Sequence, residues 1–183
     1  MTLQSPPTHL YTIEEFAAFI AQPENEDSLF ELIDGEIIEV SPGRTDNSYL
    51  GHLIVAAVYP FCRQHNIPCY TSGGDGTYNI QGHVVAPDFA YKPTPMSNEY
   101  PDPVSPLWAV EIISPTDKGT DIRKKRSIYR QAGILYWEMY PLEKAIEVYA
   151  SGQPVQEFRI DDVLDGGDVL PGFTLAMRDL FGE

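Results

Sequence analysis

The stretch Leu107–Lys125 reads LWAVEIISPTDKGTDIRKK and decides how the rest of the chain is interpreted. Its first residues, 107–113, form an apolar run that contains one acid, Glu111, and such a run is typical of a buried strand. The Ser-Pro pair at 114–115 ends the strand, because proline cannot donate a hydrogen bond to a sheet and restricts the residue before it. A helical pattern begins near Thr120. The stretch therefore predicts a buried carboxylate just ahead of a basic helix.

A buried carboxylate needs a cation, a metal ion or strong hydrogen-bond donors, because an unpaired charge is costly to remove from water. Asp88, in the segment VVAPDFA, is a second acid in apolar surroundings. We expect segments 84–91 and 107–113 to be neighbouring strands, which would make Asp88 and Glu111 a candidate site for a divalent metal. The alternative is structural: both acids would pair with an arginine or lie at strand ends.

The segment FELIDGEI, residues 30–37, adds a third acid. Its Asp34-Gly35 pair is a strong signal for a type I′ hairpin turn, which would place Glu31 opposite Ile38. Both faces of this hairpin carry apolar side chains, so we expect both to be covered. Glu31 is then an acid on a mostly apolar face, and it either serves a site or lies at the edge of a strand.

Helical and strand patterns alternate along the chain. Helices are predicted from a capping box at Thr12 and Glu15 to about Pro23, from a cap at Asn47 or Ser48 to about His65 with a bend or early end at Pro60, at 120–132 and at 176–181; strands are predicted at 29–40 (the hairpin), 68–71, 77–80, 84–91, 107–113, 134–140, 145–150 and 155–160; loops are predicted at 92–106 and 161–170. This order predicts an α/β fold with a mixed central sheet flanked by helices. The 183 residues suit one domain, with residues 1–10 as a loose arm.

The composition limits the classes of function. Lys and Arg number 12 against 27 Asp and Glu, and the net charge of −15 opposes non-specific nucleic-acid binding, which depends on neutralising phosphates. One exception is the basic run 123–126. Cys62 and Cys69 match neither a metal site nor a disulfide framework, so we expect a reduced, cytoplasmic protein. No signal peptide is seen, and the longest apolar run, 53–59, is too short to cross a membrane.

Several motifs together resemble the Uma2 family (DUF820), a group abundant in cyanobacteria within the PD-(D/E)XK restriction-endonuclease-like superfamily. The matching motifs are FELIDGEI at 30–37, SP at 41–42 followed by the helical His52, PD at 87–88, VEIISP at 110–115, the D-x-x-x-K-x-x-x-Y pattern at 121–129, AGI with YW at 132–137, and LPGF at 170–173. They occur in the order of the family and extend over nearly the whole chain. Each motif is weak alone, and together they are specific.

The resemblance implies a restriction-endonuclease-like fold and a metal-dependent phosphodiesterase site. Asp88 and Glu111 would hold Mg²⁺ or Mn²⁺ together with the carbonyl of Ile112, and Glu31 would orient a metal-bound water or a second ion. This agrees with the preference of hard divalent cations for oxygen ligands and with their lowering of the pKa of bound water.

The lysine of the wider superfamily is missing from its usual place, two residues after Glu111, where this chain has Ile113. The resemblance implies that Lys125, on the next helix, replaces it and stabilises charge near the scissile phosphate. The alternative for Lys125 is a solvated ion pair with Asp121, one helical turn earlier. Asp121, Lys125 and Tyr129 share one helical face.

The remaining candidates are supporting residues. We expect His52 to be a core residue or to lie behind the ligands, and Tyr129 to pack rather than to react.

The chain also departs from the family pattern at two further places. Leu135 stands where the family usually has an acid, and Tyr140-Pro141 stands where it usually has an Asp-Pro pair.

Two functions follow as hypotheses. The first is a Mg²⁺- or Mn²⁺-dependent endonuclease acting on DNA, with RNA as the alternative substrate, and compatible with a homodimer that cuts two strands. The second is a catalytically inactive module of the same fold that binds nucleic acid or a protein partner, which the net charge and the displaced lysine favour.

Overall fold

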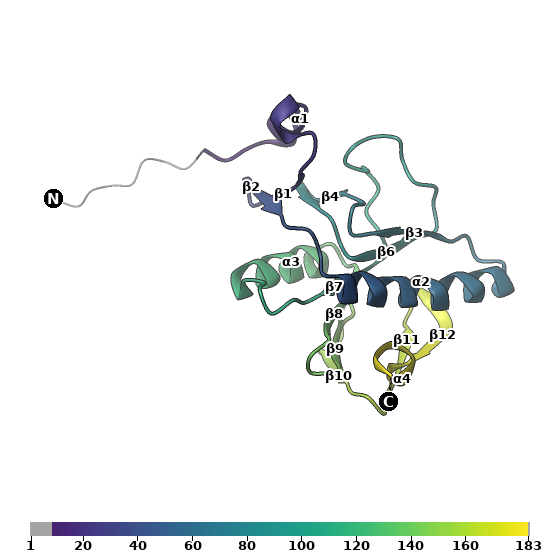
Figure 1. Ribbon diagram of the computed structural model, residues 1–183. Helices are drawn as coiled ribbons and strands as arrows, with labels where there is room; N and C mark the ends of the chain where they lie inside the picture. The colour runs from purple at the N-terminus through teal and green to yellow at the C-terminus, as the bar shows by residue number, and fades with distance from the viewer. Residues whose placement is uncertain (1–8, 183) are drawn as a thin grey trace.

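The computed structural model describes residues 9–182 (Figure 1). Its elements in chain order are α1 (Ile13–Ile20), the 3-10 helix η1 (Pro23–Asn25), β1 (Leu29–Ile33), β2 (Glu36–Val40), α2 (Thr45–His65), β3 (Tyr70–Gly73), β4 (Tyr78–Ile80), β5 (His83–Val85), β6 (Phe89–Lys92), β7 (Trp108–Ile112), α3 (Gly119–Gln131), β8 (Leu135–Tyr140), β9 (Ala145–Tyr149), β10 (Gln156–Phe158), β11 (Val163–Gly166), β12 (Leu170–Ala176) and α4 (Met177–Phe181). The loose arm expected at 1–10 lies, except for its last two residues, outside the described residues.

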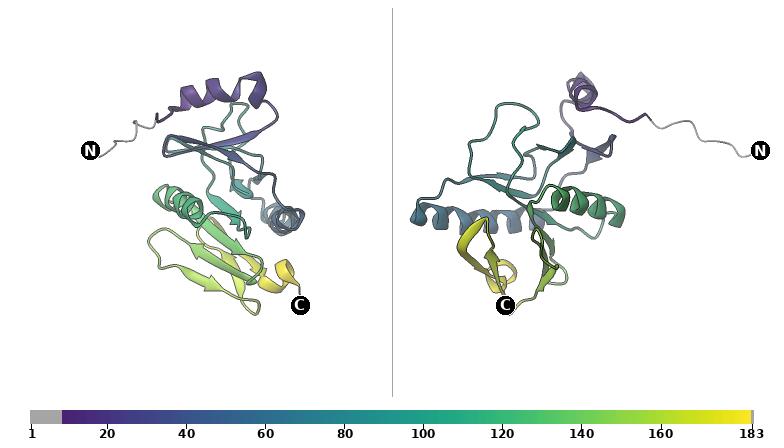
Figure 2. Two further views of the ribbon diagram at one scale, coloured as in Figure 1. Left: turned by 60° about the vertical axis from the view of Figure 1, so that its left-hand side comes forward. Right: turned by 180° about the vertical axis from the view of Figure 1, so that it is seen from behind.

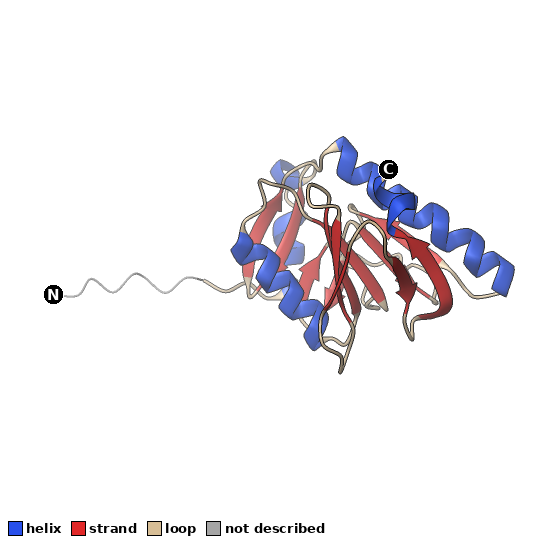
Figure 3. Ribbon diagram, turned by 90° about the horizontal axis from the view of Figure 1, so that it is seen from below, coloured by secondary structure: helices blue, strands red, loops and turns tan. Residues whose placement is uncertain are grey.

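The central layer is a six-stranded mixed sheet in the order β10-β9-β8-β7-β6-β3. β7 and β8 are parallel, and α3 is the crossover between them. One face of the sheet packs against α2, α4 and the β11–β12 pair, and α3 covers the other (Figures 1 and 3). Side chains alternate between the two faces along β7, which explains both contacts. Trp108 and Val110 face the core formed with α2, and Ala109 faces the core formed with α3. The predicted α/β fold is confirmed.

A second sheet, β2-β1-β5-β4, lies above α3 in both views of Figure 2. The β1–β2 hairpin has the predicted register, with Glu31 opposite Ile38, and both turn residues have positive φ as a type I′ turn requires. Phe30 and Leu32 pack beneath α1, whose predicted capping box is present, while Ile33 faces the core shared with α3. The hairpin is therefore covered on both faces, as predicted.

The prediction of one strand over 84–91 is wrong. The segment divides into β5 and β6, which belong to different sheets, and residues 86–88 cross between them. Pro87 explains the break, because it cannot donate to either ladder and keeps Ala86 out of helical geometry. Asp88 consequently lies at the point where the chain passes from one sheet to the other.

The predicted end of α2 at His65 is confirmed, and the early end considered at Pro60 is not found. Pro60 lies on an exposed face, where water can bond the carbonyl that loses its helical partner. The acidic loop expected at 161–170 instead contains β11 and the start of β12, anchored by the buried Leu164 and Leu170.

Candidate active site

Four predicted residues meet at one place, although they come from distant parts of the sequence. Lys125 Nζ lies 2.8 Å from Glu31 Oε1 and 3.2 Å from Glu111 Oε2. Asp88 Oδ2 accepts a hydrogen bond of 2.7 Å from the N–H of Ile112, the residue after Glu111. We call Glu31, Asp88, Glu111 and Lys125 the acid–lysine cluster.

Strand register brings the acids together. β6 pairs with β7 so that Phe89 is opposite Val110, and the next position on each strand places Asp88 beside Glu111. β1 supplies Glu31 from the second sheet, and its Oε1 accepts a hydrogen bond of 2.8 Å from the N–H of Ala86. The crossing between the two sheets, residues 86–88, is therefore hydrogen-bonded at both ends: Ala86 donates to Glu31, and Asp88 accepts from Ile112.

α3 supplies the cation. The side chain of Lys125 is 17% exposed and turns inward, where it contacts both glutamates. Across residues 9–182, no ion pair joins Lys125 to Asp121. Asp121 is half-buried and accepts a hydrogen bond from the hydroxyl of its neighbour Thr120.

The electrostatics of the cluster follow from two causes, its burial and the mutual effects of three carboxyl groups and one ammonium. Burial raises the pKa of Glu111 to about 8; the Lys125 ammonium opposes this rise, and the Asp88 and Glu31 carboxylates add to it. Burial also raises the pKa of Asp88, against the hydrogen bond from Ile112. Burial disfavours the Lys125 ammonium, but Glu111 and Glu31 outweigh it and raise the pKa of Lys125, which stays charged.

Two further contacts fix the cluster. Tyr129 is fully buried, and its hydroxyl donates to Glu111 Oε1 at 2.7 Å while its ring stacks on Tyr136. The carbonyl of Ile112 accepts a hydrogen bond of 2.9 Å from Asn47 Nδ2. The backbone of Ile112 is thus held at both of its polar groups, the N–H by Asp88 and the carbonyl by Asn47, and the carbonyl retains one lone pair for another donor or an ion.

Asn47 is a site residue that sequence reasoning missed. It was expected at most as a helix cap, but α2 begins at Thr45 and Asn47 lies buried in its first turn.

The orientation of α2 also explains why His52 is exposed rather than in the core. Gly51 faces the cluster, since a Cβ there would lie 3.3 Å from the Asp88 carbonyl oxygen, and His52 is rotated about 100° away. The Nδ1 of His52 lies 2.7 Å from the carbonyl of Ser48.

The atoms that Asp88, Glu111 and the Ile112 carbonyl could offer to a metal ion are all oxygens, which suits a hard cation such as Mg²⁺. Within the described part of the chain, no three Asp, Glu, His or Cys side chains gather as a metal-binding group. The protein would therefore contribute two carboxylates and the Ile112 carbonyl, and water and substrate would complete the coordination, as is usual for Mg²⁺. By this test the residues present fit the ion.

Comparisons with known proteins concern the family and the fold. A model of the Uma2 family, described as "Putative restriction endonuclease", matches residues 13–178. A solved structure from Anabaena variabilis, described as a putative nuclease belonging to DUF820, is similar with a TM-score of 0.76 and 22% identity, covering 93% of this chain and 97% of that chain. At this identity the likeness concerns the fold. No curated protein matches the chain.

Within residues 9–182, no helix is both long enough and apolar enough to cross a bilayer.

Proposed function

The chain belongs to the Uma2 family of putative restriction endonucleases, and from this premise we propose that it is a metal-dependent endonuclease that hydrolyses phosphodiester bonds in DNA rather than RNA. We propose one nuclease domain over residues 1–183, acting in the cytoplasm, with two copies pairing to cut both strands. The observation that carries the proposal is the acid–lysine cluster. Two buried carboxyl groups, of Glu31 and Glu111, contact one lysine, and the half-buried Asp88 lies beside Glu111 in the strand register, an arrangement that is costly for stability alone and common at catalytic sites.

The side chains of the cluster would divide the work. Asp88 and Glu111 would hold Mg²⁺ or Mn²⁺ with the Ile112 carbonyl, and Tyr129 would keep Glu111 oriented through its hydrogen bond to Oε1. When bound, the ion supplies a Lewis acid and a water of lowered pKa. Glu31 would orient the attacking water. Lys125 would donate an N–H to the scissile phosphate and offset the charge that develops there.

Cleavage and metal binding by acid-to-amide variants test this proposal. Asp88→Asn and Glu111→Gln should each lower the rate of cleavage about 100-fold or more, because each removes a group that stabilises the transition state. Labelled single-stranded DNA, duplex DNA and RNA would be incubated with Mg²⁺ or Mn²⁺, and calorimetry would measure metal binding. Asp168→Asn is the matched control, since Asp168 is exposed in the distant β11–β12 turn. Cleavage by both cluster variants at the rate of this control would overturn the proposal.

A second candidate is a module of the same fold that binds nucleic acid or a protein without turnover. The observation in its favour is that the Lys125 ammonium is already bonded by two buried carboxylates. This candidate predicts binding that is indifferent to Mg²⁺. Metal-dependent cleavage that disappears in Glu111→Gln would exclude it.

A further inference from the structure

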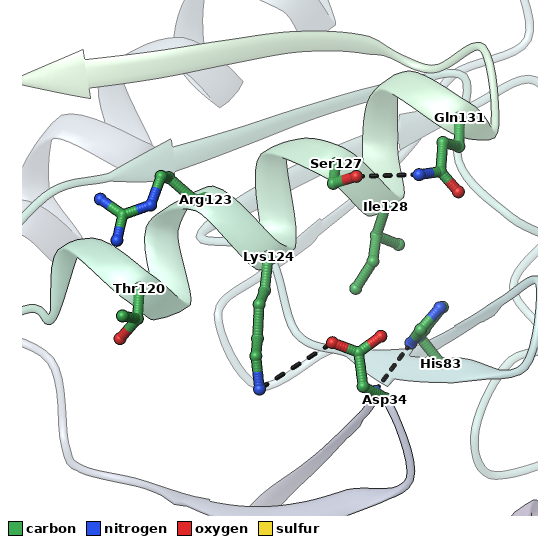
Figure 4. Close-up of a pocket in the computed structure, with 8 residues that line it drawn as sticks. All are labelled: Asp34, His83, Thr120, Arg123, Lys124, Ser127, Ile128 and Gln131. Carbon is green, nitrogen blue, oxygen red and sulfur yellow. Dashed lines mark hydrogen bonds and ion pairs between the residues drawn. The ribbon is translucent and has the colours of Figure 1, made fainter.

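A groove of about 370 Å³ lies between α3, the helix that also carries Lys125, and the turns of two hairpins (Figure 4). It is lined mainly by Thr120, Arg123, Lys124 and Ser127 of α3, by Asp34 of the β1–β2 turn and by His83 of β5. The volume is within the range of ligand sites, about 300–1,000 Å³. We call this the α3 groove.

The segment around α3 concentrates the positive charge of the chain, and two of its cations, Arg123 and Lys124, line the groove. Residues 118–130 contain six of the 12 basic side chains in a protein with a net charge of −15. Arg123 is exposed, and it takes part in none of the ion pairs within residues 9–182. Lys124 extends across the groove to the hairpin, 3.0 Å from Glu36 Oε2 and 3.9 Å from Asp34 Oδ2. Arg123 is therefore an exposed cation that lines the groove and has no ion-pair partner among the described residues.

Neutral donors accompany these cations. The hydroxyl of Ser127 accepts a hydrogen bond from Gln131 Nε2, which leaves its own proton to be donated elsewhere. Nδ1 of His83 accepts from the N–H of Asp34 at 3.2 Å, so the neutral ring carries its proton on Nε2. Arginine, lysine and hydroxyl donors in one place are the usual partners of phosphate oxygens in nucleic-acid complexes.

We propose that the α3 groove binds a phosphodiester of the substrate strand that flanks the one being cut. This inference rests on the proposed function, since it assigns a part of the same substrate. The sequence of α3 supports it: Lys125 enters the acid–lysine cluster, and its neighbour Lys124 lines the groove, about 100° around the helix. Arg123 lies about 200° around the helix from Lys125. A strand with one phosphate at Lys125 would therefore follow the surface of α3 and place a neighbouring phosphate at Lys124 and Arg123.

The salt dependence of DNA binding tests the groove. Fluorescence anisotropy in EDTA would measure the Kd of labelled duplex and single-stranded oligonucleotides between 50 and 200 mM salt. Each phosphate contact contributes about 0.9 to the slope of log K against log salt for a duplex and about 0.7 for a single strand. Arg123→Gln and Lys124→Gln should each lower the slope by about that amount. Arg63→Gln, which removes an exposed charge at the far end of α2, should leave the slope unchanged.

A variant of opposite sign strengthens the test. Asp34→Asn removes a carboxylate from the groove and one of the two carboxylates beside Lys124, so it should tighten binding. The turn should survive, because Asn-Gly is as good a type I′ turn as Asp-Gly. Asp168→Asn removes the same charge far from the groove and should have no comparable effect. Thermal melting would verify that each variant is folded.

The outcomes separate the groove from the active site. If Arg123→Gln and Lys124→Gln bind like Arg63→Gln while Glu111→Gln loses cleavage, the groove assignment is overturned and the proposed function stands. If the wild-type protein neither binds nor cuts nucleic acid, both are overturned. A loss in Arg63→Gln equal to that in Arg123→Gln would also overturn the groove, since any surface cation would then serve.

Discussion

α3 is held to the central sheet by a second ion pair, one residue beyond Lys125. Arg126 Nε donates to Glu138 Oε2 at 2.8 Å, and Arg126 Nη2 donates to Glu138 Oε1 at 2.5 Å. The hydroxyl of Tyr140 also donates to Glu138. The side chain of Glu138 is 0% exposed and that of Arg126 is 27% exposed. Arg126→Met would leave a fully buried carboxylate without its cation.

Breaking a buried ion pair from one side costs about 3–5 kcal/mol. Arg126 is partly exposed and Tyr140 remains as a donor to Glu138, so we expect the lower end, about 3 kcal/mol. For a chain of this size each kcal/mol shifts the Tm by about 2–4 °C, so the expected fall for Arg126→Met is about 6–12 °C. Replacing both partners, as Arg126→Met with Glu138→Leu, removes the buried charge and should return the stability to within about 1–2 kcal/mol of the wild type.

Urea unfolding and thermal melting of the wild type, both single variants and the double variant would complete the cycle. Tyr140→Phe is the control, since it removes one hydrogen bond from the same carboxylate and should cost about 1 kcal/mol. A loss below about 1 kcal/mol in Arg126→Met, or a double variant no more stable than the single variants, would refute the reasoning. Because Arg126 adjoins Lys125 on α3, the single variant should also slow cleavage.

Three other changes test different parts of the structure. In the folded protein the pKa of Glu111 is about 8 against an ordinary 4.5, so its favourable contribution is full below pH 4.5 and is lost as the pH rises to about 8. Glu111→Gln should therefore gain Tm over the wild type between pH 5 and 8 in EDTA, and a constant difference would contradict this. Lys92→Met should cost about 3–5 kcal/mol in urea unfolding, because Lys92 is 1% exposed and its Nζ lies 2.5 Å from Asp102 Oδ2; a neutral result would mean that Asp102 is satisfied without it. Gly35→Ala should cost about 1–2 kcal/mol by the same measurement, since Gly35 has a φ of +76° and an added Cβ would lie 2.8 Å from Leu10 Cβ; unchanged stability would show that the turn adapts.

Local rules predicted those parts of the fold that depend on neighbouring residues. The Asp34-Gly35 turn gave the register of the β1–β2 hairpin, and the Ser-Pro pair at 114–115 marked the end of β7. The carboxylates of Glu31 and Glu111 were recognisable because acids in apolar strands are rare. The sequence could not show that both contact Lys125, since that contact depends on how two sheets and a helix pack.

Other features were hidden because the decisive partner is remote. Asn47 reads as an ordinary residue at the start of a helix, and only the folded chain brings its amide to the Ile112 carbonyl. Glu138 lies in an apolar pattern like that of Glu111 and is more deeply buried, yet it was not singled out. In the sequence, its partner Arg126 appears only as a member of the basic run 123–126. A search for every acid inside a predicted strand, each matched with the cations of the following helix, would have found this pair.

The strongly acidic composition and a polyanionic substrate are compatible because electrostatic attraction in salt solution is local. At physiological ionic strength the screening length is about 8 Å, so a strand lying along α3 responds chiefly to the cations of that helix. Lys125 and Arg126 are committed to buried carboxylates, while Lys118, Arg123 and Arg130 are exposed. If the proposed function holds, the net charge of −15 would weaken non-specific binding, and the exposed cations of α3 would favour the approach of a strand along that helix.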